Sequence, residues 1–272
     1  KSKKRNSKEI VQEIENVGGQ INAYTSKEAT CYYIKALNTH LDLSIDILAD
    51  MLINSKFDDE EISKEQGVVI EEINMSEDMP EDVLDNNQSK AIFGENSLSY
   101  PILGTIENIK SFNSSKIKKF VKSHYAPHNS VVSVCGKFDE KELMKMLEDK
   151  FGEWEGDKDY IPTYETPILL NNTQYTNKQI EQLHINLAFN GLPYAHEKAY
   201  SLVLLNNVFG GGASSILFQK VREELGLCYT IYSYSHPYLG AGINNIYTGV
   251  SKQSAEKALD VINKELKKFA KE

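Results

Sequence analysis

Two glutamates, Glu65 and Glu72, have the residue type and spacing that could hold a metal ion. They are seven residues apart in a predicted helix over 58–75, so they lie along one line of that helix. The apolar positions Val69 and Ile73 fall beside them in the same arc. A carboxylate on an apolar flank is typical of a metal ligand. The alternative is a pair of boundary carboxylates that reach water, because burying an unpaired carboxylate is costly.

The histidines of this sequence do not supply the further ligands that a metal site would need. Of the six histidines, only His124 and His128 lie within one helical turn of each other. No Glu lies between them, and Pro127 breaks any helix that would align the two rings. We therefore interpret both as loop or surface residues. The Tyr-rich run over 229–238 is interpreted as strand and core packing, with substrate contact as the alternative.

The spacing of hydrophobic residues along the sequence predicts the helices and strands that position these side chains. In the first half, Ser7 is predicted to cap a helix ending near Val17, before Gly18. Further helices are predicted at 41–53, 58–75, from Pro80, at 115–123 and at 140–151, with strands at 20–25, 30–36 and 130–135. In the second half, strands are predicted at 182–189, 227–234 and 242–249, with helices at 197–208, 214–225 and 254–269.

The order helix, glycine, strand, turn, strand, helix occurs twice, over 7–53 and over 214–269. This repeat predicts a tandem duplication. We expect an α+β protein of two duplicated domains, each a mixed or antiparallel sheet packed with helices. The expected boundaries are 1–155, a linker at 156–178 that is rich in turn-forming residues, and 179–272. Both domains are expected to be truncated, because the second copy stops before an equivalent of the 58–75 helix.

Composition excludes some classes of function. The net charge is −9, whereas a nucleic-acid partner needs clustered Lys and Arg. No run approaches the ~20 apolar residues that span a bilayer, and no signal peptide follows the basic start. The three cysteines, Cys31, Cys135 and Cys228, are far apart and are expected to be reduced core residues. We therefore expect a cytoplasmic protein that binds neither nucleic acid nor membrane.

Three segments resemble signatures of the insulinase/pitrilysin zinc peptidases, especially their bacterial branch similar to the mitochondrial processing peptidase. They are the run from Gly18 to Ser26, the pair Glu65 and Glu72, and the run from Val221 to Tyr229. Their order and spacing also agree with the family. The resemblance extends over essentially the whole chain, so it is more specific than a single motif.

The resemblance implies a role for each matching residue. Glu72 matches a zinc ligand, and Glu65 matches a carboxylate that orients the site. Asn22 and Ala23 match an exposed edge strand that pairs with substrate. The pair Arg222 and Tyr229 matches residues that meet substrate and stabilise the developing oxyanion.

The family's His-x-x-Glu-His motif is absent from these 272 residues. It would supply the other two zinc ligands and the general base. We therefore expect a zinc metalloendopeptidase that cleaves extended peptides, of which this chain alone is inactive and leaves its Zn²⁺ site unoccupied. The resemblance also implies a peptide or unfolded polypeptide substrate and a homodimer in the intact protein. The alternative is a noncatalytic peptide-binding or assembly subunit of the same family.

Overall fold

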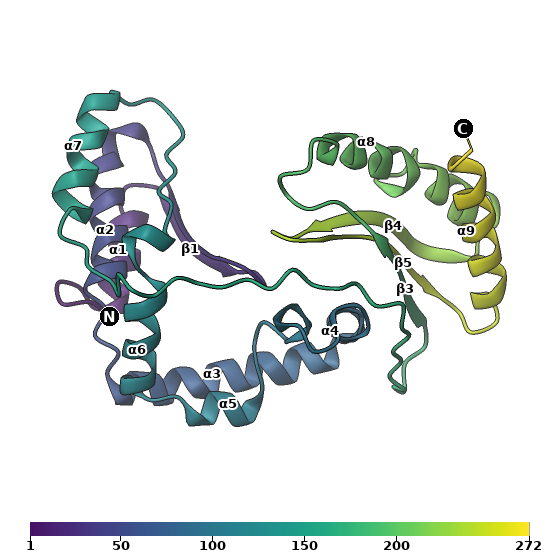
Figure 1. Ribbon diagram of the computed structural model, residues 1–272, viewed down its shortest axis with the longest axis horizontal. Helices are drawn as coiled ribbons and strands as arrows, with labels where there is room; N and C mark the ends of the chain where they lie inside the picture. Colours follow the sequence, from purple (N-terminus) through teal and green to yellow (C-terminus); the bar gives the residue numbers. More distant parts are fainter. Residues whose placement is uncertain (272) are drawn as a thin grey trace. The chain divides into compact units, whose positions relative to one another are not determined.

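The computed structural model describes residues 1–271, which form two compact units (Figure 1). The first unit comprises Lys1–Glu71 and Ile102–Thr163. The second comprises Glu72–Pro101 and the chain from Tyr164 onward. The division falls inside one long helix, because the segment after Glu71 contacts the second unit. The expected boundaries at 155 and 179 concern the duplicated halves and stay a prediction.

The first unit contains a two-stranded antiparallel hairpin that packs against its helices on one side. Strand β1 (Gln20–Thr25) pairs with β2 (Thr30–Lys35), with Gln20 opposite Lys35 and Thr25 opposite Thr30. Helices α1 (Ser7–Glu15) and α2 (Leu41–Ile53) supply the buried cluster Ile10, Ile14 and Ile47, and hairpin residues Ile21 and Ile34 pack against it. Burying such aliphatic side chains contributes about 1.5–3 kcal/mol each, which fixes the hairpin on the helices.

The start of α1 is one residue earlier than the sequence pattern predicted. Asn6, rather than Ser7, is the N-cap: its side chain accepts from the Glu9 amide, and the Glu9 carboxylate accepts from the Asn6 amide. This reciprocal pair satisfies two amides that the helix itself leaves without partners. The other helices of this unit are the first part of α3 (Asp59–Asp78), then α5 (Ile106–Ser111), α6 (Ser114–His124) and α7 (Glu140–Phe151), with 3-10 turns at Asn38–His40 and Pro127–Asn129.

The strand predicted over 130–135 is wrong. Val131 is 93% exposed and Val132 is 50% exposed, and the run forms no ladder with any strand among residues 1–271. An apolar run becomes a strand only where a neighbouring backbone pairs with it, and within residues 1–271 no strand pairs with this one. The expectation that Cys135 is a core residue fails for the same reason, since its side chain is exposed.

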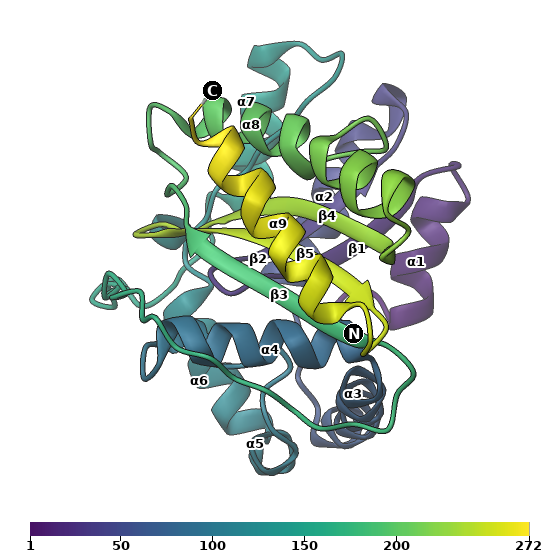
Figure 2. The same cartoon turned by 90° about the vertical axis from the view of Figure 1, so that its right-hand side faces the viewer.

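The second unit is built on a three-stranded antiparallel sheet with the strand order β3-β5-β4. These strands are β3 (Leu183–Asn190), β4 (Cys228–Pro237) and β5 (Gly242–Val250). Helices α8 (Ala199–Gly210) and α9 (Ala255–Phe269) lie on one face of the sheet, as Figure 2 shows for α9. With antiparallel sheets and helices in both units, the chain has the expected α+β fold.

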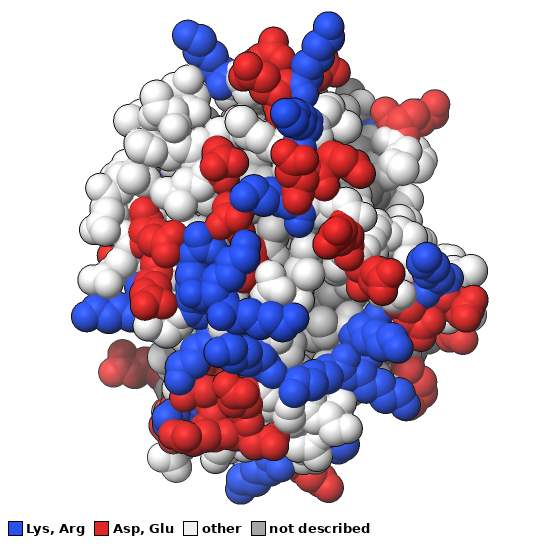
Figure 3. All heavy atoms as spheres, turned by 90° about the vertical axis from the view of Figure 1, so that its left-hand side faces the viewer, with Lys and Arg blue, Asp and Glu red and all other residues white. Residues whose placement is uncertain are grey.

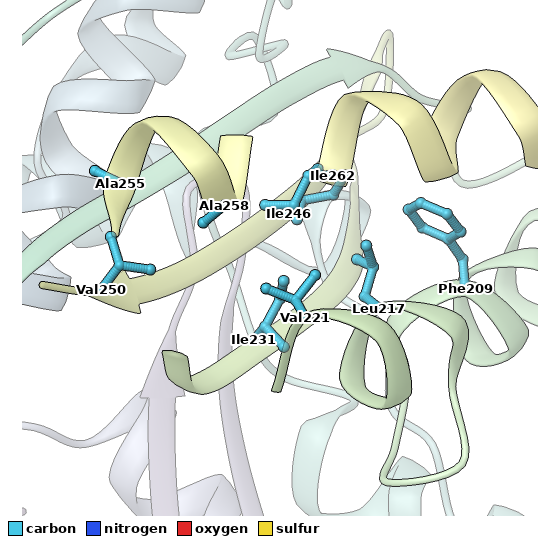
Figure 4. Packing of buried hydrophobic residues seen from close by; sticks show 9 residues of the cluster. All are labelled: Phe209, Leu217, Val221, Ile231, Ile246, Val250, Ala255, Ala258 and Ile262. Atoms are coloured by element: carbon cyan, nitrogen blue, oxygen red, sulfur yellow. The ribbon is translucent and has the colours of Figure 1, made fainter. Parts of the chain in front are cut away.

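An aliphatic core joins the sheet to α8 and α9 (Figure 4). Leu217, Val221 and Ile262 are fully buried, and Ile246 of β5 is 2% exposed. Helix α4 (Pro80–Phe93), followed by a 3-10 turn at Ser97–Ser99, packs on the opposite face, where the Gln88 side chain donates to Asn245. The sheet therefore lies between two helical layers with different chemistry.

Charged side chains are mixed on the molecular surface. On the face drawn in Figure 3, Lys and Arg side chains lie next to Asp and Glu side chains. Several Lys and Arg side chains adjoin one another across the middle of this face, and carboxylates lie directly beside, above and below them. None of the helices within residues 1–271 is both long and apolar enough to cross a membrane.

Candidate functional site

The outer edge of β1 is open. Within residues 1–271, β1 pairs with β2 and with no other strand, and five of its six residues are exposed. The Ser26 amide donates to the Ala29 carbonyl at 2.8 Å and closes the hairpin. Hydrogen-bonded and non-hydrogen-bonded pairs alternate in an antiparallel ladder. By this alternation, Ile21, Ala23 and Thr25 direct their amides and carbonyls outward.

One of these outward amides already has a substitute partner. The Ala23 amide donates to the Asn22 side-chain carbonyl at 2.8 Å. Asn22 therefore occupies the place that a neighbouring strand would take. Exposed edges are usually protected by Lys, Pro or a bulge, and none of these lies within 20–25. Asn22 and Ala23 thus lie in an exposed edge strand, and their role in pairing with substrate stays a prediction.

Helix α3 carries the two glutamates that the sequence singled out. Both Glu65 and Glu72 are exposed, whereas Ile73 is 7% exposed. The carboxylates therefore have water on at least one side, as the boundary alternative supposes. Glu65 also lines a cavity of about 380 Å³ in the first unit, next to Ile62 and Val69. This matches the expected apolar flank for Glu65. Glu72 belongs to the second unit.

Arg222 and Tyr229 are brought together in the second unit. The Arg222 guanidinium carbon lies 4.5 Å from the centre of the Phe218 ring and 5.1 Å from that of Tyr229. Its Nη1 donates to the Glu223 carboxylate at 3.0 Å. The cation is held by two rings and one anion, which restricts its rotamers. Tyr229 is 75% exposed, so this pair can meet a bound molecule.

The backbone beneath Arg222 differs from the predicted α-helix at 214–225. The segment Phe218–Glu224 is a π-helix, and it ends where the Leu227 amide donates to the Val221 carbonyl at 3.0 Å. The wider π-turn keeps Val221 fully buried while Arg222 stays at the surface. Gly226, at φ +59°, then turns the chain into β4.

The residues within 1–271 do not fit a zinc site by themselves. No group of three or more His, Cys, Asp or Glu side chains is placed to hold a metal there. His124 bonds to Ser123 and Tyr160, and His128 bonds to the Tyr160 carbonyl. Glu72 is one carboxylate, whereas a catalytic zinc typically takes three protein ligands. We therefore derive no catalytic step through a metal.

Sequence reasoning missed a second concentration of functional groups. Glu81 of α4 accepts from the Tyr247 hydroxyl of β5 at 2.9 Å, although 166 residues separate them. Tyr232 and Tyr234 lie on the same side of the sheet, with ring centres 5.6 Å apart. Their period of two was visible in the sequence and was interpreted as core packing. The acidic partner on α4 could not be anticipated from a local pattern.

Comparison with known proteins gives two family matches that together cover nearly all of the chain. Residues 1–106 match the family described as insulinase (peptidase family M16). Residues 111–272 match the peptidase M16 inactive domain. The boundary between the two matches, near residues 106–111, differs from the expected domain boundaries at 155 and 179, which stay a prediction.

Curated relatives and solved structures agree with these matches. The chain is 41% identical over 262 residues to YmxG of Bacillus subtilis, named as an uncharacterized zinc protease, covering 96% of the chain and 64% of that protein. It is 35% identical to an uncharacterized zinc protease of Rickettsia bellii, covering 100% of the chain and 66% of that protein. A protease from Helicobacter pylori has the same fold, with a TM-score of 0.90 and 21% identity over 98% of this chain and 67% of that one. So does a peptidase M16 inactive domain from Pseudomonas fluorescens, with a TM-score of 0.86 and 16% identity over 100% of this chain and 66% of that one.

The chain thus spans about two thirds of the length of these curated relatives. The recognition made from the three sequence signatures is confirmed at the level of the family, and the processing-peptidase-like branch stays a prediction. Because the two family matches together cover nearly all of its residues, this chain belongs to the insulinase (M16) family of peptidases.

Proposed function

We propose that this chain is the peptide-binding part of a zinc metalloendopeptidase that cleaves extended peptides, and that residues 1–272 alone bind a peptide without cleaving it. The open edge of β1 carries this proposal. Ile21 and Thr25 offer main-chain donors and acceptors to an added strand, and Ala23 offers its carbonyl, with its amide following once its bond to the Asn22 side chain opens. Main-chain pairing gives affinity with little demand on peptide sequence, which suits an endopeptidase.

The second unit supplies a cationic group for the same substrate class. Arg222 is held in place by Phe218 and Tyr229, so its positive charge costs little reorganisation when a negative oxygen develops nearby. We assign Arg222 and Tyr229 to substrate contact. Glu72 is assigned as one carboxylate of a zinc site and Glu65 as its orienting carboxylate, in keeping with relatives named as zinc proteases.

Adding a labelled extended peptide to the chain tests the β1 proposal. Ala23→Pro removes the outward amide at the centre of the edge, and proline is tolerated at the open side of an edge strand. One lost main-chain hydrogen bond weakens binding by about 0.5–1.5 kcal/mol, roughly twofold to tenfold. The second probe is the same peptide N-methylated at alternate residues, which should bind only when its methyl groups point away from β1.

The matched control is Ala29→Pro in the hairpin turn, where the amide bonds only to the Ser26 hydroxyl. This change leaves the outward groups of β1 in place. Equal peptide affinity for Ala23→Pro and the parent, with both methylation patterns binding alike, would show that β1 does not add a strand.

A noncatalytic peptide-binding or assembly subunit is the second candidate. The lack of a three-ligand metal group within residues 1–271 is compatible with both candidates. A cleavage assay on a longer protein that includes the His-x-x-Glu-His motif distinguishes the two candidate functions, because only a peptidase cleaves peptide in a way that a metal chelator inhibits. A homodimer remains a proposal for that longer protein.

A further inference from the structure

The sheet of the second unit has one aliphatic face and one polar, aromatic face. Successive side chains of a strand point to opposite faces. In β4 and β5, Ile231 and Ile246 face the aliphatic core, whereas Tyr232 and Tyr247 face the other way and lie opposite each other in the ladder. A sheet face covered by a helix is usually apolar, so this polar face needs another explanation.

A pocket of about 330 Å³ separates this face from the N-terminal half of α4. The ring centres of Tyr232 and Tyr247 are 4.9 Å apart, and Tyr234 extends the aromatic wall. From α4, Glu81 and Asp85 lie one turn apart on the same line of the helix and line the pocket. Aromatic rings on one wall and carboxylates on the other form a small cage.

The cage has negative charge without an internal counter-ion. Asp82 lines it together with Glu81 and Asp85, and within residues 1–271 no Lys or Arg side chain forms an ion pair with any of the three. Burial, with the charges of Glu81 and Asp85 adding to it, raises the pKa of Tyr232. Burial likewise raises the pKa of Tyr234 to about 12. The phenols stay neutral and line the pocket together with the carboxylates.

One further polar atom at this pocket has no partner. Asn186 of β3 donates through Nδ2 to the Tyr234 hydroxyl at 3.0 Å, but its buried Oδ1 makes no hydrogen bond. An acceptor that is removed from water without a donor is unfavourable, and native proteins seldom leave one. A ligand that carries N–H donors would satisfy it.

We propose that this pocket binds an organic cation, a guanidinium or a primary ammonium group. Carboxylates and the Asn186 carbonyl accept its N–H groups, and the tyrosine rings attract its charge. Three aromatic rings favour such a cation over a metal ion, because a guanidinium gives up its water readily. The cation comes either from a basic side chain of a bound peptide, which rests on the proposed function, or from a free amine.

Binding to the complete chain tests the proposal without any cleavage assay. The probes are a capped tripeptide with a central arginine, the same peptide with the neutral isostere citrulline, and the free amine agmatine. Nuclear magnetic resonance shifts of Tyr232 and Tyr247 report occupancy. We expect the arginine peptide to bind at least about tenfold more tightly than the citrulline peptide, with an affinity that falls as salt is raised.

Two variants locate the site. Asp85→Asn should weaken binding of the arginine peptide about fivefold or more, because it removes a charge without changing shape. Asn186→Asp should strengthen it, because an anion then stands at the unpartnered oxygen. The matched control is Glu256→Gln on α9, an exposed carboxylate on the helical layer that covers the aliphatic face.

The outcomes separate the sources of the cation and the two proposals. Tighter binding of the arginine peptide than of agmatine assigns the pocket to peptide side chains, and the reverse order assigns it to free amines. Equal affinity for arginine and citrulline peptides, or Asp85→Asn and Glu256→Gln behaving alike, would overturn the inference. Strand addition is read from the amides of Ile21 and Ala23 in the same spectra, so either proposal can fail alone.

Discussion

The ion pairs of Asp46 in α2 give a test of how the helices of the first unit are held together. The Asp46 carboxylate accepts from Arg5 at 2.7 Å and from Lys150 at 2.8 Å, which joins the segment before α1 to α2 and α7. Burial opposes ionisation of Asp46, but the hydrogen bonds from Lys150 and Arg5 outweigh it and lower the pKa from 3.8 to about 2. The ionised form is therefore favoured in the folded state.

The pKa shift gives the size of the effect. A shift of this size corresponds to roughly 2.4 kcal/mol at about 1.36 kcal/mol per unit, and screening by water at a partly exposed site reduces it to about 1–2 kcal/mol. Because the folded pKa is depressed, this stability is present above pH 3.8 and is lost as the pH falls toward 2. Asp46→Asn should therefore destabilise the first unit by about 1–2 kcal/mol at pH 7 and by much less near pH 2.

The assay is urea unfolding followed by the fluorescence of Trp154, the only tryptophan, which lies in the same unit as Asp46. Asp42→Asn is the control, because Asp42 is an exposed residue of the same helix and its variant should stay within about 0.5 kcal/mol of the parent. Equal midpoints for Asp46→Asn and the parent at pH 7, or a difference that is unchanged at pH 2, would refute the reasoning.

Three further predictions concern the core and the metal site. Ile246→Ala should destabilise the second unit by about 2–5 kcal/mol, because Ile246 is buried in its core. Val203→Ala, at an exposed site, should change the free energy of unfolding by less than about 0.5 kcal/mol. Unfolding in urea followed by far-UV circular dichroism measures both variants, and similar values would contradict the packing shown for Ile246. The chain should retain no stoichiometric zinc after dialysis, because residues 1–271 contain no group of three metal-ligating side chains; metal analysis that finds one zinc per chain would contradict this. In a longer protein that includes the His-x-x-Glu-His motif, Glu72→Gln should abolish zinc binding and peptide cleavage together. The control variant Glu71→Gln should behave like the parent. Equal activity of the two variants would mean that Glu72 is a carboxylate at the edge of the core and not a zinc ligand.

Local patterns predicted the elements that depend on local physics. The strand at 20–25 and the helix at 41–53 match the structure; the helical period of 41–53 reflects burial of one face, whereas five of the six residues in 20–25 are exposed. The prediction of a strand at 130–135 was wrong because a strand also needs a neighbouring strand to pair with, which the local sequence does not specify. The predicted helix at 214–225 was a π-helix over Phe218–Glu224, since nothing in its periodicity distinguishes the two turns.

The candidate site was predictable only where motif and local geometry coincide. Arg222 and Tyr229 are seven residues apart and meet through one turn, so a short signature could identify them. The contact between Glu81 and Tyr247 joins segments 166 residues apart, and no period in the sequence encodes it. Asn22 lay in the recognised signature, but its bond to the Ala23 amide depends on the edge being open.

Hydrogen exchange at the β1 amides tests the central claim most directly. In the free chain, Ile21 and Thr25 should exchange quickly, whereas Asn22, which pairs with Tyr33 in the ladder, should be protected. An added extended peptide should slow exchange at Ile21, Ala23 and Thr25 and leave Asn22 unchanged. Peptide binding that leaves these three amides exchanging as before would contradict strand addition at β1 and, with it, the proposed peptide-binding function.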